Sequence, residues 1–299
     1  METCSLVEIP STHQIHHCLT MDAVTLIGEE IRANSPPSVL FAHGFGQTRQ
    51  SWSGAQLALS KQGIGSIAWD MRGHGESGRN ALELHYQAEQ FAEDVRLLSQ
   101  RFENKPLLVG ASMGGLTGMM AQARHDVFSA LVLVDVTPRW EIAGVARIMA
   151  FMKAFPNGFD SHDHAADVIA NYLPQRRERK NSKQLKFLLR EHQGRFFWHW
   201  DTRMLSEFVE HSEHLQDYIR EAAQQITVPT LLISGGKSDI VSEQTIADFL
   251  QLVPHAEHRS LPDATHMVAG DDNDAFNDLL LSFKRTLSQQ PYAVTGVSV

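Results

Sequence analysis

The residue of this chain best suited to act as a nucleophile is Ser112, within the pentapeptide Gly-Ala-Ser-Met-Gly of residues 110–114. Residues 105–109 predict a buried strand before it, and the apolar residues 116–121 predict a helix packed on that strand. A serine at such a junction is held on a sharp turn with its hydroxyl exposed. Glycines flank it because a side chain at either position would crowd the neighbouring backbone. The pattern therefore predicts nucleophilic chemistry at Ser112.

Polar residues follow other short apolar runs in the same way. The runs are 38–41 before His-Gly-Phe-Gly (43–46), 64–69 before Asp-Met-Arg-Gly-His-Gly-Glu-Ser (70–77), 130–134 before Asp135, and 229–233 before Ser-Gly-Gly-Lys-Ser-Asp (234–239). Last comes His266, which follows the run 256–261. These runs alternate with segments of helical periodicity. The alternation predicts an α/β fold whose mainly parallel sheet is covered by helices on both faces.

Taken together, these motifs resemble the alpha/beta-hydrolase superfamily over about residues 20–288. The resemblance implies the α/β-hydrolase fold, a mostly parallel, doubly wound sheet with an inserted helical cap. The combination of motifs is highly specific for the superfamily and much less specific for any one substrate. A serine at position 112 argues against the dehalogenase and epoxide-hydrolase branches, whose nucleophile at this turn is aspartate.

The chain order of Ser112, Asp239 and His266 matches the order of nucleophile, acid and histidine expected of this fold. A serine hydroxyl is a poor nucleophile until a base accepts its proton, and the resemblance assigns that base to His266. A carboxylate at Asp239, just beyond a strand, would hold the imidazole in the tautomer that leaves its other nitrogen free. Asp135 ends a strand at the same edge of the sheet, and some members of the superfamily use an acid there. It is the alternative to Asp239.

The negative charge that develops on a carbonyl oxygen during acyl transfer needs fixed hydrogen-bond donors. The backbone N–H of Met113, directly after the nucleophile, is one candidate, and the resemblance places the second at Phe45. We expect Asp70, Arg72 and His74 to form a hydrogen-bonded loop that supports the site rather than to take part in catalysis.

Residues 137–226 interrupt the alternation, and a connection of about 90 residues must contain structure of its own. Its segments 143–155, 163–172, 182–189 and 204–225 are helical in character. We therefore expect a core of residues 1–136 and 227–290, a helical cap at 137–226 and a flexible tail at 291–299. Side chains that could line a substrate pocket are His43, Trp140, Trp198 and Trp200, although packing would also explain the three tryptophans.

Composition limits the classes of partner. The 299 residues carry a net charge of −9, which argues against a nucleic-acid partner. The two cysteines, Cys4 and Cys18, fit a reducing cytosol. No basic-then-apolar signal peptide and no apolar run near the ~20 residues of a membrane span is present, so we expect a cytoplasmic protein. The histidines lack metal-binding spacings, so neither a metal nor a cofactor is expected.

These observations predict a serine hydrolase that cleaves a carboxylic ester or lactone of a small-to-medium, partly apolar substrate through an acyl-enzyme. Two other activities could use the same residues: cleavage of a carbon–carbon bond next to a ketone, and perhydrolase or haloperoxidase-like activity, in which peroxide replaces water. A ligand receptor without turnover is a third alternative, disfavoured because a pure binder does not need a complete triad. The sequence does not fix the oligomeric state.

Overall fold

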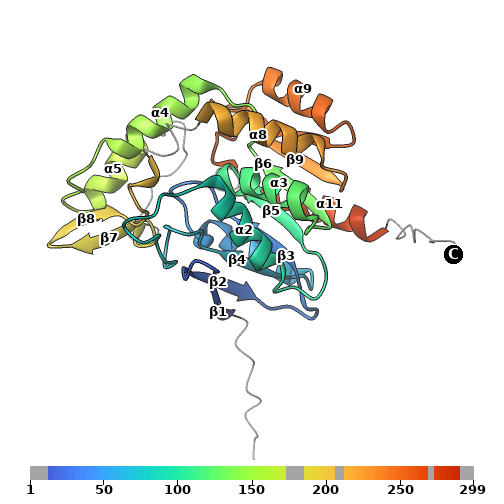
Figure 1. Ribbon diagram of the computed structural model, residues 1–299, viewed down its shortest axis with the longest axis horizontal. Coiled ribbons are helices and arrows are strands. Elements are labelled where there is room, and N and C mark those ends of the chain that lie inside the picture. Colours follow the sequence, from blue (N-terminus) through green and yellow to red (C-terminus); the bar gives the residue numbers. More distant parts are fainter. Residues whose placement is uncertain (1–12, 173–184, 206–211, 269–272, 290–299) are drawn as a thin grey trace, which may run out of the picture.

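A computed structural model describes residues 13–172, 185–205, 212–268 and 273–289. Its centre is an eight-stranded sheet in the order β1-β2-β4-β3-β5-β6-β9-β10 (Figure 1). The strands are β1 (His13–Leu19), β2 (Thr25–Ile31), β3 (Pro37–Ala42), β4 (Gly65–Trp69), β5 (Leu107–Ala111), β6 (Ala130–Val134), β9 (Thr230–Gly235) and β10 (Glu257–Leu261). The β1–β2 and β2–β4 pairs are antiparallel, and the remaining pairs of this sheet are parallel. The predicted mainly parallel sheet is confirmed.

The strands differ in composition according to their place in the sheet. All five residues of the central strand β6, Ala-Leu-Val-Leu-Val, are buried. At one edge of the sheet, β1 alternates between exposed and partly buried residues. A parallel strand covered on both faces has no exposed side and therefore needs an apolar run, whereas an edge strand alternates. This contrast explains why the central strands were visible in the sequence as short apolar runs.

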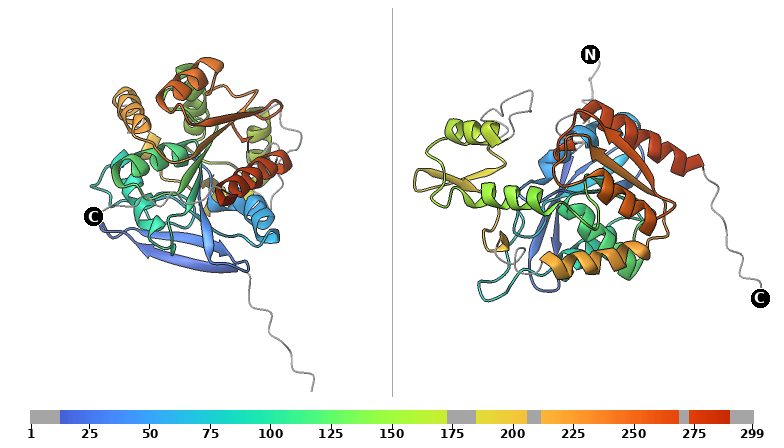
Figure 2. Two further views of the ribbon diagram at one scale, coloured as in Figure 1. Left: turned by 90° about the vertical axis from the view of Figure 1, so that its right-hand side faces the viewer. Right: turned by 90° about the horizontal axis from the view of Figure 1, so that it is seen from above.

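Helices cover both faces of the sheet, as the doubly wound arrangement requires (Figure 2). One face is covered by η1 (Arg49–Trp52), α1 (Ser53–Lys61) and α11 (Asn273–Gln289), which pack Trp52, Leu59 and Phe276 on the strands. The other face is covered by α2 (Ala88–Ser99), α3 (Met113–His125), α8 (Ser212–Gln224) and α9 (Glu243–Leu252). In the described part of the chain, no helix has the length and the apolar composition to span a membrane.

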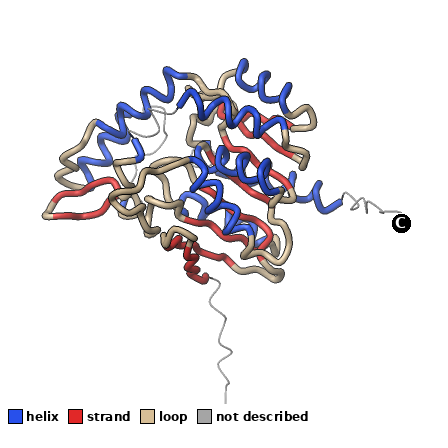
Figure 3. Tube along the Cα trace, viewed as in Figure 1, coloured by secondary structure: helices blue, strands red, loops and turns tan. Residues whose placement is uncertain are grey.

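In its described residues, the insertion between β6 and β9 has two helices and a hairpin that extend away from the sheet, on the left in Figures 1 and 3. They are α4 (Ile142–Lys153), α5 (His162–Tyr172), β7 (Leu189–His192) and β8 (Arg195–Trp198). The first two confirm predicted helices. Together these elements bury a small apolar cluster of their own, which includes Phe159, Ile169 and Leu189.

The insertion also contains a hairpin, β7–β8, which the sequence analysis did not predict. Gln193 and Gly194 connect β7 to β8 with φ angles of +51° and +74°. Two consecutive residues with positive φ form the turn that best matches the twist of a two-residue hairpin. The predicted helix at 182–189 falls partly outside the described residues, and its last residue, Leu189, begins β7.

The predicted boundary of the cap also needs correction, because α8 lies with the helices that cover the sheet. Its residues Ile219 and Ala223 are buried in the same apolar cluster as Met119 of α3, and α8 and α3 are packed together. An amphipathic helix of this kind buries its apolar stripe on whichever surface is nearest, here the outer side of α3. The predicted tail, 291–299, and Cys4 lie outside the described residues; Cys18 is a buried free thiol.

Candidate active site

Ser112 lies on a strained turn between β5 and α3. Its φ and ψ are +46° and −118°, a conformation with positive φ that is unfavourable for a residue with a side chain. The turn is held on both sides: the Ser112 N–H donates to the Val134 carbonyl at 3.1 Å, and the Ser112 carbonyl accepts from the Leu116 N–H at 3.0 Å. Backbone strain held in this way is common where a side chain must be presented to a ligand.

The two glycines of the turn are required by close backbone contacts, as the sequence predicts. A Cβ atom on Gly110 would lie 2.7 Å from the backbone of Gly114. A Cβ atom on Gly114 would lie 2.3 Å from the carbonyl oxygen of Ala42, at the end of β3. The second contact brings the Ser112 turn against the loop that follows β3.

That loop, residues 43–46, is named the oxyanion loop below. A Cβ atom on Gly44 would lie 3.2 Å from the Cβ atom of Ser112, so the loop lies directly beside the candidate nucleophile. Phe45 and Met113 both line the same cavity as Ser112. Within the part of the chain that the structure describes, neither of their N–H groups donates a hydrogen bond. Two unpaired amide donors beside a serine can stabilise a developing oxyanion.

His266 is hydrogen-bonded to Asp135. The Nδ1–H of His266 donates to Asp135 Oδ2 at 2.7 Å, and a carboxylate can only accept, so the ring proton lies on Nδ1. Asp135 is fully buried and accepts two further hydrogen bonds, from the Gly235 N–H at 2.8 Å and from the Ser238 hydroxyl at 2.6 Å. The carboxylate is therefore fixed, and the other nitrogen of His266 makes no hydrogen bond with the residues that the structure describes.

The choice of Asp239 as the partner of His266 is not supported by these contacts. Asp239 lies four residues beyond the end of β9 and forms an ion pair with Arg147 of α4. The neighbouring Ser238 donates to Asp135 instead, so the loop after β9 helps to fix the carboxylate that follows β6. We therefore replace Asp239 with Asp135, the alternative acid of the sequence analysis, in the catalytic scheme proposed below.

Two buried histidines hold the oxyanion loop from behind. His43 donates from Nδ1 to the Gly44 carbonyl at 2.8 Å and accepts from the Met71 N–H at 3.0 Å. His74 donates to the Arg72 carbonyl at 3.1 Å and accepts from the Gly46 N–H at 3.1 Å. Burial lowers the pKa of both rings, which keeps them neutral and able to accept as well as to donate. His43 thus braces the loop, and it is not among the residues that line the cavity.

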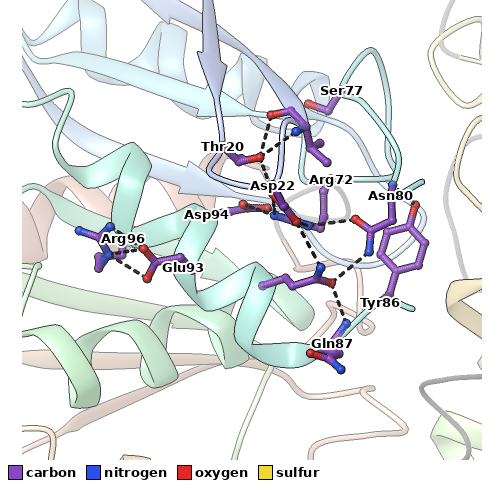
Figure 4. Close-up of polar contacts among 12 residues, drawn as sticks. Thr20, Asp22, Arg72, Ser77, Asn80, Tyr86, Gln87, Glu93, Asp94 and Arg96 are labelled. Atoms are coloured by element: carbon purple, nitrogen blue, oxygen red, sulfur yellow. Dashed lines mark hydrogen bonds and ion pairs between the residues drawn. The ribbon is translucent and has the colours of Figure 1, made fainter. Parts of the chain in front are cut away.

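The loop after β4 supports the site through charged hydrogen bonds, as predicted. Asp70 accepts from the N–H groups of Arg49 at 2.7 Å and Glu76 at 3.0 Å, and it pairs with the Arg49 guanidinium. Arg72 is held by Asp22 and Asp94 (Figure 4), with N–O distances of 2.6 Å to each. These bonds fix the segment that carries His74.

The cavity has a volume of about 460 Å³ and lies between the sheet edge and the insertion. Most of its lining is apolar, and five methionines contribute to it: Met113, Met149, Met152, Met204 and Met267. Of the tryptophans predicted to line a pocket, Trp198 does so, whereas Trp140 and Trp200 do not. Trp140 is buried in the apolar cluster that also contains Met119 of α3, and Trp200 is buried against Phe45, with ring centroids 5.0 Å apart.

The charged residues of the cavity wall are paired. Arg147 pairs with Asp239, and the Lys237 Nζ atom lies 2.7 Å from Asp263 Oδ1. The described lining therefore offers an incoming ligand no cation without a partner. Among the described residues, no group of three or more histidine, cysteine, aspartate or glutamate side chains is arranged to hold a metal ion.

Comparisons with known proteins agree with this geometry. The family model for the alpha/beta hydrolase fold matches residues 37–272, and the chain belongs to that family. It is 29% identical over 264 residues to the sn-1-specific diacylglycerol lipase of Mus musculus, covering 83% of this chain and 80% of the lipase. It is 28% identical over 244 residues to an esterase of Mycobacterium tuberculosis, covering 74% of this chain and 73% of the esterase.

The fold is also similar to solved structures. The crystal structure of E-2-(acetamidomethylene)succinate hydrolase superposes with a TM-score of 0.79 at 22% sequence identity, covering 91% of this chain and 99% of that one. In sequence, the chain is 26% identical over 266 residues to the 2-(acetamidomethylene)succinate hydrolase of Mesorhizobium japonicum, covering 87% of this chain and 92% of that protein. The chain is thus a hydrolase of the alpha/beta hydrolase superfamily.

Proposed function

We propose that this chain is a serine hydrolase that cleaves the carboxylic ester or lactone bond of a neutral, small-to-medium, partly apolar substrate. The observation that carries the proposal is the arrangement around one cavity. Ser112 and His266 line it together with Phe45 and Met113, whose N–H groups donate to none of the described residues, and a buried carboxylate orients His266.

The chemistry follows from that arrangement. The free nitrogen of His266 takes the proton as Ser112 Oγ attacks the carbonyl carbon, and Asp135 stabilises the imidazolium that forms. The Phe45 and Met113 amides bind the oxyanion of the tetrahedral intermediate. When the intermediate collapses, the C–O bond to the alcohol breaks and His266 returns the proton to the leaving oxygen. Water then attacks the acyl-enzyme in the same way and releases the acid.

The substrate class is inferred from the lining of the cavity. Methionine side chains adapt to a flexible apolar group, and a volume of about 460 Å³ is in the usual range for a small-molecule site. The succinate named for one relative carries two carboxylates, but here Arg147 and Lys237 are already paired. An uncharged ester fits this wall better. The lipase and esterase names of two other relatives support ester cleavage.

Perhydrolase activity is a second candidate. The chain is 26% identical over 290 residues to the non-heme chloroperoxidase CPO-A1 of Kitasatospora aureofaciens. In the proposed scheme, peroxide could replace water in the attack on the acyl-enzyme and would yield a peracid instead of an acid. This would be a side activity of the same site and would depend on the same residues.

The test is a panel of p-nitrophenyl esters and lactones of increasing chain length, with Ser112→Ala as the comparison. We expect turnover by the wild-type chain and a loss of at least ~1000-fold in kcat in Ser112→Ala, because the nucleophile is absent. A fluorophosphonate should label Ser112 in the wild-type chain. Binding of these compounds without turnover would favour the receptor alternative. Turnover that survives Ser112→Ala would contradict the assignment of the nucleophile.

A further inference from the structure

A short segment that leaves the insertion passes behind the oxyanion loop. It consists of residues 199–201, directly after β8, and is named the strap here. Its first residue, His199, is 2% exposed. The Nδ1 atom of His199 accepts a hydrogen bond from the Gly75 N–H at 2.7 Å, and its Nε2 atom lies 3.2 Å from the Gly46 carbonyl oxygen. No role in catalysis is assigned to His199 by the sequence pattern.

These partners determine where the proton of the His199 ring lies. The Gly75 N–H can only donate, so Nδ1 must be the accepting nitrogen. The proton is then on Nε2, which donates to the Gly46 carbonyl. Burial lowers the pKa of His199 to about 3, so the ring is neutral at neutral pH and both hydrogen bonds persist.

Three histidines together fix three consecutive peptide groups of the oxyanion loop. His43 donates to the carbonyl of Gly44, whose peptide group also carries the Phe45 N–H. His74 binds the next peptide group, at the Gly46 N–H, and His199 binds the one after it, at the Gly46 carbonyl. Because each peptide group is planar, holding one of its polar groups sets the direction of the other. The first two histidines come from the core, and His199 comes from the strap.

The strap is anchored independently of His199. The Asp201 N–H donates to the Gly73 carbonyl at 2.8 Å, and the Tyr86 hydroxyl donates to Asp201 Oδ2 at 2.9 Å. The Arg203 guanidinium also binds Asp201, at 2.7 Å. A change at position 199 should therefore leave the strap in place and alter only what it presents to the oxyanion loop.

We propose that His199 is a positioning residue for catalysis: its Nε2–H, donated to Gly46, holds the oxyanion loop in the conformation in which the Phe45 N–H meets the oxyanion. The proposal rests on the proposed function, because it assigns a role in the same acyl transfer. It links the insertion to the chemistry, since the strap follows directly from β8, whose last residue, Trp198, lines the cavity.

Two substitutions separate the two hydrogen bonds of His199. The amide of His199→Asn reaches the position of Nδ1 and can still accept from Gly75, but it is too short to reach Gly46. The amide of His199→Gln reaches the position of Nε2 and can still donate to Gly46. The control is Tyr86→Phe, which removes the hydrogen bond that the Tyr86 hydroxyl donates to Asp201 of the same strap.

We expect kcat for a p-nitrophenyl ester to fall about 10- to 100-fold in His199→Asn, with KM changed less than about threefold. The substitution displaces the Phe45 N–H, which binds the oxyanion of the transition state and not the bound ester. The Ki of a trifluoromethyl ketone, which forms an oxyanion on Ser112, should rise by a similar factor. His199→Gln should restore most of kcat. Tyr86→Phe should lower Tm without this loss of kcat.

Three results would overturn the proposal: wild-type kcat in His199→Asn, equal losses in the Asn and Gln variants at equal Tm, or the same loss of kcat in Tyr86→Phe. They are distinguishable from failure of the proposed function. If the wild-type chain hydrolyses no ester or lactone at all, the proposed function is wrong and this inference is wrong with it. If the wild-type chain is active and His199→Asn is unaffected, only the inference is wrong.

Discussion

The charged groups at the edge of the sheet and those facing the insertion differ in burial and in the number of their hydrogen bonds. At the sheet edge, Asp135 is fully buried and accepts three hydrogen bonds from groups fixed by the backbone and by packing. At the insertion, Arg147 meets Asp239 in an ion pair whose side chains are 61% and 27% exposed. Buried, fully satisfied groups are costly to disturb, whereas an exposed pair contributes little. In the proposed function, the fixed groups of the sheet edge carry out the chemistry and the insertion selects what reaches them.

The largest expected effect separates the two carboxylates. Asp135→Asn should lower kcat by about 10⁴-fold, because an amide in place of the carboxylate favours the wrong tautomer of His266. Asp239→Asn should lower kcat for a neutral ester by less than about tenfold, because it touches only the exposed pair. Steady-state kinetics of both variants on one p-nitrophenyl ester measure the difference. A greater loss in Asp239→Asn would restore the acid that the sequence order suggested.

This ambiguity between two carboxylates marks a limit of the sequence. Asp135 follows β6 and Asp239 follows β9, and these two strands are parallel neighbours in the sheet. The positions of the strand ends therefore place both carboxylates in the same region. Which one meets His266 depends on Ser238 and Gly235, whose hydrogen bonds to Asp135 form only when the two strand ends are side by side. Ser112, by contrast, was identifiable because its requirements are local: a strand, a turn between glycines and a helix.

The insertion shows a second limit. The Gln193-Gly194 pair is a local signal for a hairpin turn. We did not use this signal, because the surrounding segments have helical periodicity. The strap gave a weaker signal, a histidine between two tryptophans. Its role could not be predicted because both partners of His199, Gly46 and Gly75, are more than 120 residues away in the sequence. Contacts of this range depend on the assembled fold.

A smaller effect concerns the charged network behind the oxyanion loop. The Arg72 guanidinium, hydrogen-bonded to Asp22, lowers the pKa of that carboxyl from its usual 3.8 to about 2. Because the pKa is lower in the folded chain, this pair stabilises the fold above pH 3.8, and the contribution is lost as the pH falls toward 2. With Asp22 partly exposed, we expect Asp22→Asn to lower the free energy of unfolding at pH 7 by about 1–2 kcal/mol.

Urea unfolding at pH 7 and at pH 3 checks this expectation. The difference between wild type and Asp22→Asn should shrink at pH 3, because this is below the unfolded pKa of 3.8 and the Asp22 carboxyl of the unfolded chain is then mostly protonated. Asp278→Asn is a suitable control, because Asp278 is exposed on α11 and makes no ion pair with the other described residues. A difference for Asp22→Asn that stays constant between the two pH values would mean that the charge pair with Arg72 does not contribute to stability.

The smallest effect tests whether the insertion selects substrates by charge. Asp239 neutralises Arg147 at the cavity wall, so Asp239→Asn should leave the guanidinium available to a ligand. An ester with a terminal carboxylate on its acyl chain should then gain about two- to tenfold in kcat/KM relative to a neutral ester of equal length. Arg147→Met should give no such gain, because the cation is absent. Salt should weaken the gain, since the pair is exposed to solvent. Equal kcat/KM ratios in all three proteins would show that the Arg147–Asp239 pair lies apart from the path of the substrate, and selection would then depend on the apolar lining alone.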